Sequence, residues 1–285
     1  MSYPAEVQVV EVGPRDGFQN VEAWIPTEKK LKVIAALLEA NLKRIEVTSF
    51  VNPRSVPQMR DAALVAKGIR EFGAAEFIAL VPNLAGARAA FEAGIKEVTF
   101  VISASERHNM QNVRRTIAGS FEELQALKNE LPELRIKLGI ATAFGCPFQG
   151  DVPVGQVIEM MERGLSLPVD EICLCDTTGM ANPRQVEDVL SKINSHFGGL
   201  KYGLHLHDTG GMGLANVVAA LQQGVTVFDS SVGGLGGCPF SPGASGNIAT
   251  EDLVNMLHRM GIRTNVDLPR LFEAARMVRT QTGAV

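Results

Sequence analysis

Short β-branched segments alternate with amphipathic helical patterns along nearly the whole chain. Between these segments apolar residues recur at helical spacing, as at Leu214, Val217, Val218 and Leu221, which places one apolar stripe against a sheet. A parallel sheet needs crossover helices, and eight strands can close on themselves. The pattern predicts a (β/α)₈ or TIM barrel, with an open doubly wound sheet as the alternative. The eight predicted strands are 7–12, 44–48, 76–81, 97–101, 135–141, 171–175, 201–206 and 225–230.

The same pattern bears on helix starts and on domain number. Asn182 before Pro183 and Thr250 before Glu251 are predicted helix N-caps, and two additional C-terminal helices are expected from Thr250 onward. The chain has 285 residues, of which 46% are hydrophobic, enough for one large core rather than two. We therefore expect a single domain over residues 1–285.

Charge and cysteine spacing exclude several classes of protein. A net charge of −4 gives no overall attraction for nucleic acid or for an anionic membrane, so we expect a small-molecule partner. The cysteines lack paired CxxC spacing, which argues against a zinc knuckle or a disulfide framework. There is no basic-then-apolar leader and no run of about 18 apolar residues. A cytoplasmic location is expected.

Polar residues cluster where the predicted strands end. In a (β/α)₈ barrel the carboxyl ends of all strands meet at one mouth, where the chemistry takes place. Residues two apart on a strand share a face, so His205 and His207 can point into this mouth, although two chance histidines are the alternative. With Asp16 they form a nitrogen and oxygen site that suits Mg²⁺ or Mn²⁺ at least as well as Zn²⁺. The strand-end residues are Arg15, Asp16, Glu46, Asp176, His205, His207, Cys238 and Asn247.

Residues 233–247 are too rich in glycine for a strand or a helix, so we expect a mobile loop. Cys238 on such a loop could close over bound substrate and exchange a proton, or it could be a buried structural thiol. Glu251 is a candidate catalytic acid, but the helix dipole alone favours an acidic residue in a first turn. Arg15 and Asp16 could likewise be a surface ion pair.

Six segments together resemble the 3-hydroxy-3-methylglutaryl-CoA lyase family, collinearly from about residue 7 to about residue 270. They are 10–20, 46–51, 56–59, 145–148, 176–177 and 233–251. The wider superfamily of lyases, synthases and carboxyltransferases shares the barrel, the Arg15-Asp16-Gly17 motif and the His-x-His-Asp motif. The cysteine loop is the mark of the lyase branch.

The resemblance implies a site and a partner. It implies a divalent cation held by Asp16, His205, His207 and Asn247, an acyl-CoA substrate and a homodimer. It also implies that Arg15 and Gln19 contact the substrate. The implied functional surroundings of the metal are Arg15, Glu46, Asp176, His205, Cys238 and Glu251.

These residues can carry out a retro-Claisen cleavage, in which a tertiary alcohol loses its proton, a carbon–carbon bond breaks and acetyl-CoA leaves as an enolate. Arg15 can stabilise the enolate oxygen. Asp16, His205 and Asp176 are candidates for the base, and we expect Cys238 to protonate the carbanion. The expected products are acetyl-CoA and acetoacetate.

Two departures from the family pattern bear on the substrate. Gly210-Gly211-Met212 stands where the family has Tyr-Gly-Gln, and Val21-Glu22 stands where it has Glu-Lys. Citramalyl-CoA or a longer-branched 3-hydroxyglutaryl-CoA would use the same bond cleavage in a different pocket. A synthase that condenses acetyl-CoA with a 2-oxo acid, a metal hydrolase and a non-catalytic binding barrel are three further candidate functions for a barrel of this kind.

Overall fold

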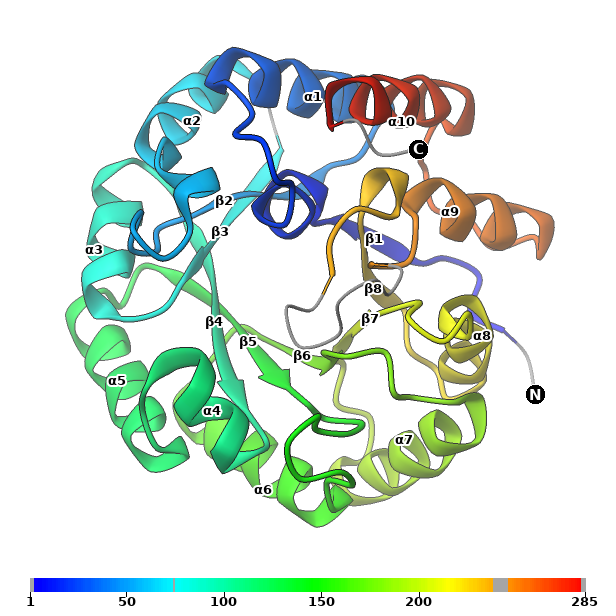
Figure 1. Ribbon diagram of the computed structural model, residues 1–285. Coiled ribbons are helices and arrows are strands. Elements are labelled where there is room, and N and C mark those ends of the chain that lie inside the picture. Colours follow the sequence, from blue (N-terminus) through cyan, green and yellow to red (C-terminus); the bar gives the residue numbers. More distant parts are fainter. Residues whose placement is uncertain (1–2, 74, 238–245, 283–285) are drawn as a thin grey trace.

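The computed structural model describes residues 3–73, 75–237 and 246–282. Its centre is a closed barrel of eight parallel strands in sequence order, which confirms the predicted barrel (Figure 1). β1 closes the barrel by pairing with β8, where Gln8 is opposite Val227. The strands are β1 Gln8–Glu11, β2 Arg44–Ser49, β3 Glu76–Val81, β4 Glu97–Ser103, β5 Arg135–Ala141, β6 Glu171–Asp176, β7 Gly203–Leu206 and β8 Val227–Ser230.

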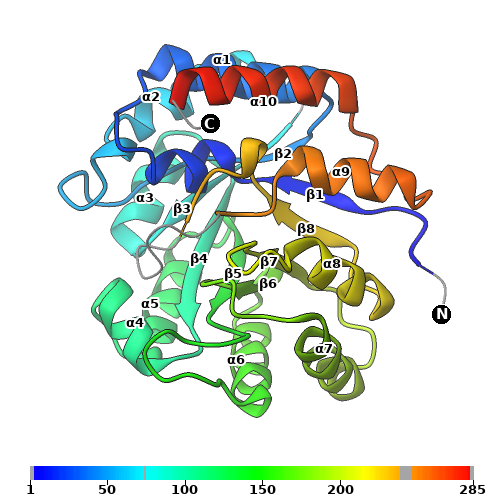
Figure 2. The ribbon, with the colours of Figure 1, turned by 45° about the vertical axis from the view of Figure 1, so that its right-hand side comes forward.

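The helices surround the barrel, and α10 lies along α1 in both views (Figures 1 and 2). The helices are α1 Thr27–Glu39, α2 Ala62–Gly68, α3 Leu84–Glu92, α4 Glu106–Val113, α5 Ile117–Glu130, α6 Val154–Ser166, α7 Pro183–Phe197, α8 Gly213–Gln222, α9 Thr250–Arg259 and α10 Leu268–Thr282. Short helical segments are η1 Gly13–Gly17, η2 Pro57–Met59, η3 Ile69–Glu71 and η4 Val232–Gly234. The two predicted C-terminal helices are α9 and α10.

The main apolar core lies between the barrel and the helices. α7 illustrates the pattern, because Val186, Leu190 and Ile193 recur at helical spacing and are all buried. Along the described residues no helix is long and apolar enough to cross a membrane.

Several buried charged side chains lie inside the barrel. Arg44 on β2 forms ion pairs with Glu97 on β4 and with Glu171 on β6, the latter at 2.6 Å. Lys137 on β5 pairs with Asp229 on β8 at 2.7 Å. None of these three ion pairs joins two neighbouring strands, so the pairs cross the barrel interior. Buried charges of this kind are stable only when they are paired.

One of the two N-cap predictions is confirmed. The Asn182 side chain accepts a hydrogen bond from Gln185 N at the start of α7. The Thr250 prediction is wrong, because Ala249 holds the cap position and Thr250 is the first residue of α9. The Thr250 hydroxyl instead donates to Glu11 Oε2 at 2.7 Å.

Candidate active site

Asp16 lies in η1, directly after β1, and is buried. Pro14 lies at the start of this turn, and Glu11 fixes the turn by accepting a hydrogen bond from Gly13 N at 2.7 Å. Glycine is required at position 13, since an added Cβ would lie 2.6 Å from Glu11 Oε1. The turn therefore brings Asp16 to the mouth of the barrel at a fixed position.

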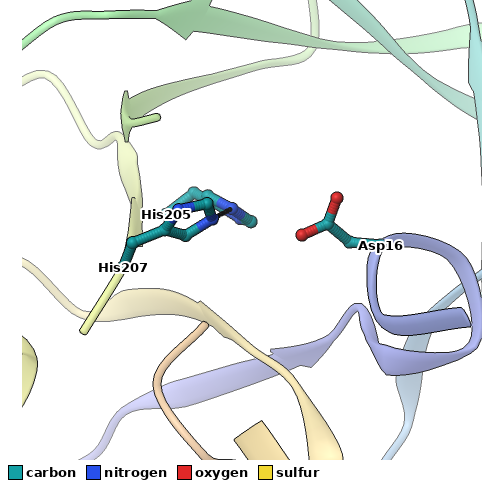
Figure 3. Close-up of side chains that lie close together, drawn as sticks. All are labelled: Asp16, His205 and His207. Atoms are coloured by element: carbon teal, nitrogen blue, oxygen red, sulfur yellow. Dashed lines mark hydrogen bonds between the residues drawn. The ribbon is translucent and has the colours of Figure 1, made fainter. Parts of the chain in front are cut away.

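His205 and His207 extend from the end of β7 toward Asp16 (Figure 3). Their Nε2 atoms lie 3.1 Å apart, and one possible ligand atom from each of the three residues lies within 4.8 Å of the others. Two ligands about 2.1 Å from one ion and at right angles to each other would lie about 3 Å apart. The spacing of the imidazoles therefore fits a shared divalent cation.

Asn247 completes the predicted ligand set. It forms an isolated antiparallel bridge with His207, and its Nδ2 donates to Asp16 Oδ2 at 2.6 Å and to Leu235 O at 3.0 Å. The amide nitrogen is thus used by the protein, which leaves the amide oxygen as the atom suited to an ion. All four predicted ligands are brought together.

Asp229 and Lys137 hold the His205 ring in place. Asp229 Oδ2 lies 3.3 Å from His205 Nδ1, and Lys137 Nζ donates to both Asp229 oxygens at 2.7 and 2.8 Å. A carboxylate behind a ligating histidine fixes its ring orientation and tautomer. Sequence reasoning missed both residues. The signal available was a charged residue directly after an apolar one within a strand, Lys137 in β5 and Asp229 in β8.

The pKa values of the two histidines move in opposite directions. Burial opposes charge on His205, but the hydrogen bond and the negative charge of Asp229 outweigh burial and raise its pKa to about 9. Burial and the neighbouring His205 lower the pKa of His207 to about 4. Burial alone would raise the pKa of Asp16, but Arg15 and the two histidines lower it.

Arg15 is held beside Asp16 by two carboxylates. Its Nη1 donates to Asp16 Oδ1 at 2.6 Å, and its Nε donates to Glu46 Oε2. Burial opposes its charge, but Glu46 and Asp16 raise its pKa further above the usual range, so it stays cationic. Arg15 is therefore buried and charged, which rules out a surface ion pair with Asp16.

A cavity of about 270 Å³ opens at this mouth. On one side it is lined by Arg15, Asp16, Gln19, Glu46, His205 and His207. Its opposite wall is apolar and includes Leu80, Val81 and Val101. Deeper in the barrel Gly139, Cys173 and Cys175 also line it, and sequence reasoning did not identify them as part of the site.

Two predicted acidic residues lie outside this cavity lining. Asp176 is buried, and its carboxylate accepts hydrogen bonds from Met180 N at 2.9 Å and Ala181 N at 3.2 Å. Burial raises the pKa of Asp176 to about 6 despite these bonds. Glu251 accepts from Gly233 N at 3.0 Å. Both carboxylates hold loops that border the site. Cys238 lies outside the described residues.

The closed barrel and the cluster of Asp16, His205, His207 and Asn247 at its mouth define a class of protein. It is the (β/α)₈ barrel enzymes that carry a metal-binding group at the carboxyl ends of their strands. The HMGL-like family model matches residues 6–278. This chain belongs to the HMGL-like family.

Curated relatives agree over nearly the full length. The hydroxymethylglutaryl-CoA lyase of Bacillus subtilis is 47% identical over 285 residues, which cover 99% of this chain and 95% of the relative. The mitochondrial hydroxymethylglutaryl-CoA lyase of Homo sapiens is 44% identical over 277 residues, covering 96% and 85% respectively.

Solved structures share the fold. The crystal structure of the Bacillus subtilis HMG-CoA lyase matches with a TM-score of 0.96 and covers 99% of this chain and 96% of that one. An HMG-CoA lyase from Acinetobacter baumannii, in complex with coenzyme A and 3-methylmalate, matches with a TM-score of 0.94 at 43% identity. The match covers 99% of this chain and 93% of the Acinetobacter chain.

Proposed function

We propose that this protein is a carbon–carbon lyase that cleaves 3-hydroxy-3-methylglutaryl-CoA to acetyl-CoA and acetoacetate. The observation that carries the proposal is the convergence of Asp16, His205 and His207 beside Arg15 in one cavity. The proposal is also supported by the 47% identity of this chain to the Bacillus subtilis hydroxymethylglutaryl-CoA lyase.

We propose Mg²⁺ or Mn²⁺ as the cofactor, held by Asp16, His205, His207 and Asn247. The donor set supports this choice, since it offers imidazole nitrogens together with carboxylate and amide oxygens and needs no thiolate. A divalent cation bound there supplies Lewis acidity that favours loss of the proton from the substrate hydroxyl and orients the bond to be cleaved.

Arg15 is the group that stabilises developing negative charge. As the carbon–carbon bond breaks, its electron pair moves into the acetyl-CoA thioester and forms an enolate. Arg15 lines the cavity, and Glu46 and Asp16 hold it in place before the reaction. A single well-placed donor of this kind is often worth about 3 kcal/mol in the transition state.

Two proton transfers complete the reaction. Asp16, His205 and Asp176 are the candidate bases for the hydroxyl proton. Asp16 and His205 line the cavity, whereas the Asp176 carboxylate accepts hydrogen bonds from two backbone N–H groups. We propose that Cys238 then protonates the enolate carbon. Support comes from described residues on either side of its segment, because Gly237 lines the cavity and Asn247 contacts Asp16.

The test is an assay with 3-hydroxy-3-methylglutaryl-CoA and Mg²⁺ under reducing conditions, with acetoacetate as the readout. We expect acetoacetate and acetyl-CoA in equal amounts, and loss of both on addition of a chelator. His207→Ala should abolish the reaction. His196→Ala is the matched control, since His196 is an exposed histidine on α7. Release of free CoA without acetoacetate would show hydrolysis and overturn the proposal.

A second candidate substrate is citramalyl-CoA, which would yield acetyl-CoA and pyruvate. Its support is the pair of departures from the family pattern at residues 21–22 and 210–212. The related Acinetobacter lyase also forms a complex with coenzyme A and 3-methylmalate, an isomer of citramalate. The two substrates should be compared by kcat/KM under identical conditions.

We further propose that the protein forms a homodimer and acts in the cytoplasm. Both follow from the family resemblance and the sequence expectations. Sedimentation velocity at micromolar concentration checks the first, with a species of twice the chain mass as the expected result.

A further inference from the structure

Two buried carboxylates hold the segment that joins β8 to the metal site. Val232 N donates to Glu11 Oε1 at 2.9 Å, and Gly233 N donates to Glu251 Oε2 at 3.0 Å. Glu11 and Glu251 are 0% and 1% exposed, so water does not replace these acceptors. The backbone at residues 232 and 233 is therefore fixed by acidic side chains.

Glu251 is in turn held by the C-terminal helix. Its second oxygen, Oε1, pairs with Arg279 Nη2 on α10 at 2.8 Å. The Arg279 side chain is 51% exposed, whereas that of Glu251 is 2% exposed. Loss of the Arg279 guanidinium would leave the buried Glu251 carboxylate without a cationic partner. A buried, unpaired charge destabilises the fold unless the side chain moves or takes up a proton.

The segment held by Glu251 touches the proposed metal ligands directly. Leu235 O accepts a hydrogen bond from Asn247 Nδ2 at 3.0 Å. A Cβ added to Gly236 would lie 2.3 Å from Asn247 Nδ2 and 3.1 Å from Asp16 Oδ2, so the backbone at Gly236 packs tightly on both ligands. A shift of residues 233–236 therefore moves Asn247 and Asp16.

We propose that Arg279 is a positioning residue for the metal site. By holding Glu251 it fixes residues 233–236, and these fix Asn247 and Asp16 in the geometry that binds the cation. The inference rests on the metal site of the proposed function. It gives Glu251 a positioning role, and through Arg279 it gives α10 a part in the activity. Neither Glu251 nor Arg279 lines the cavity.

The test measures Mn²⁺ affinity in the absence of substrate, from the electron paramagnetic resonance signal of free Mn²⁺. Arg279→Ala should raise the Kd for Mn²⁺ by about tenfold, the lower end of the range for lost groups behind metal ligands. Arg279→Lys should restore most of the affinity, because it keeps the charge near Glu251. Arg276→Ala is the matched control, since Arg276 is an exposed arginine on the same helix that pairs with Glu273.

A variant cycle separates positioning from general stability. Glu251→Gln should also weaken Mn²⁺ binding, and adding Arg279→Ala to it should have little further effect, since both changes break the same link. The Tm of metal-free Arg279→Ala should stay within about 4 °C of the wild type, as expected for about 1 kcal/mol or less from a half-exposed ion pair.

Three outcomes would overturn the inference. They are an unchanged Mn²⁺ affinity in Arg279→Ala, an equal loss in Arg276→Ala, and additive losses in the double variant. A wild-type protein that binds no Mn²⁺ would overturn the metal site and this inference together. A wild-type protein that binds Mn²⁺ but does not cleave the acyl-CoA would overturn the proposed function alone.

Discussion

Asp229 and Lys137 show that the candidate site extends beyond the residues that would touch a metal ion. Asp229 orients His205, and Lys137 compensates the buried charge of Asp229. Burial opposes charge on Asp229, but Lys137 and His205 outweigh burial and lower its pKa below the usual range. The pair therefore stays charged inside the barrel and keeps His205 in one orientation.

Replacing Asp229 should weaken metal binding. Asp229→Asn removes the charged partner of His205, and losses of this kind cost about 10- to 100-fold in metal affinity. It also leaves Lys137 buried without its carboxylate, which should destabilise the fold. The double variant Lys137→Met, Asp229→Asn should recover stability but not Mn²⁺ affinity. Isothermal titration calorimetry and thermal unfolding separate the two effects, and unchanged affinity in Asp229→Asn would contradict the role of Asp229.

Glu11 makes stability depend on pH. Burial raises its pKa from 4.5 to about 7, against the hydrogen bonds from Thr250, Val232 and Gly13 that lower it. The folded state therefore binds the proton more tightly than the unfolded state. This contribution is fully present below pH 4.5 and is lost as pH rises to about 7, a change of up to about 3 kcal/mol.

Glu11→Gln tests this dependence, because glutamine keeps an oxygen acceptor and stays neutral at every pH. The free energy of unfolding of the variant relative to the wild type should increase by up to about 3 kcal/mol between about pH 5 and pH 8. Urea unfolding at constant Mg²⁺ measures it. A difference between the two proteins that does not change with pH would rule out a raised pKa at Glu11.

Sequence predicted the convergence of Asp16, His205 and His207 better than the positions of the surrounding acids. Asp16 and the two histidines were found because strand ends meet at one mouth of a barrel. Asp176 ends a strand and Glu251 lies in the first turn of a helix, but their carboxylates bond to backbone N–H groups and lie outside the cavity lining. An acidic side chain at such a position can face the cavity or accept hydrogen bonds from the backbone of a loop. Sequence spacing alone does not distinguish these two roles.

Among the elements, a buried ion pair joins two neighbouring helices outside the barrel. Lys30 on α1 donates to Asp61 Oδ1 and to Gln58 O, both at 2.6 Å, and Thr27 donates to Asp61 Oδ2 at 2.8 Å. Asp61 precedes α2, so it joins the starts of two helices. Strand positions were predicted within about two residues, whereas this pairing of elements across the chain leaves no periodic signal.

Asp61→Ala should lower the free energy of unfolding by about 3 to 5 kcal/mol, since it leaves the ammonium of Lys30 buried without a carboxylate. Chemical denaturation measures the loss. Glu28→Ala, an exposed position on the same helix, is the control and should change stability by less than about 0.5 kcal/mol. A similar loss in both variants would show that the buried pair does not carry the effect.

Across the whole molecule, closure of the barrel assembles the site. Asp16 from the first strand and Asn247 from the segment after the eighth are 231 residues apart in sequence, yet their side chains are joined by a 2.6 Å hydrogen bond. Pairing of β1 with β8 brings the two ends together. Sequence predicted this closure because eight strand patterns alternate with helices, and the number of strands does not depend on exact boundaries.

If the chain is one domain with a metal site, it should unfold in one transition, and bound metal should raise the temperature of that transition. Calorimetry should show a single cooperative transition, and Mn²⁺ at about 100 times its Kd should add about 2.7 kcal/mol of stability. His207→Ala should lose the metal-dependent shift and keep the single transition. Two separate transitions in the wild type would contradict the single-domain prediction for residues 1–285.

The proposed chemistry depends above all on one divalent cation between Asp16, His205, His207 and Asn247. Crystals grown with Mn²⁺ reveal whether it binds there, through anomalous diffraction collected near the manganese absorption edge. We expect one strong anomalous peak, about 2.0 to 2.3 Å from the Nε2 atoms of both histidines and from an Asp16 oxygen. A peak elsewhere, or none between these side chains at saturating Mn²⁺, would contradict the metal site.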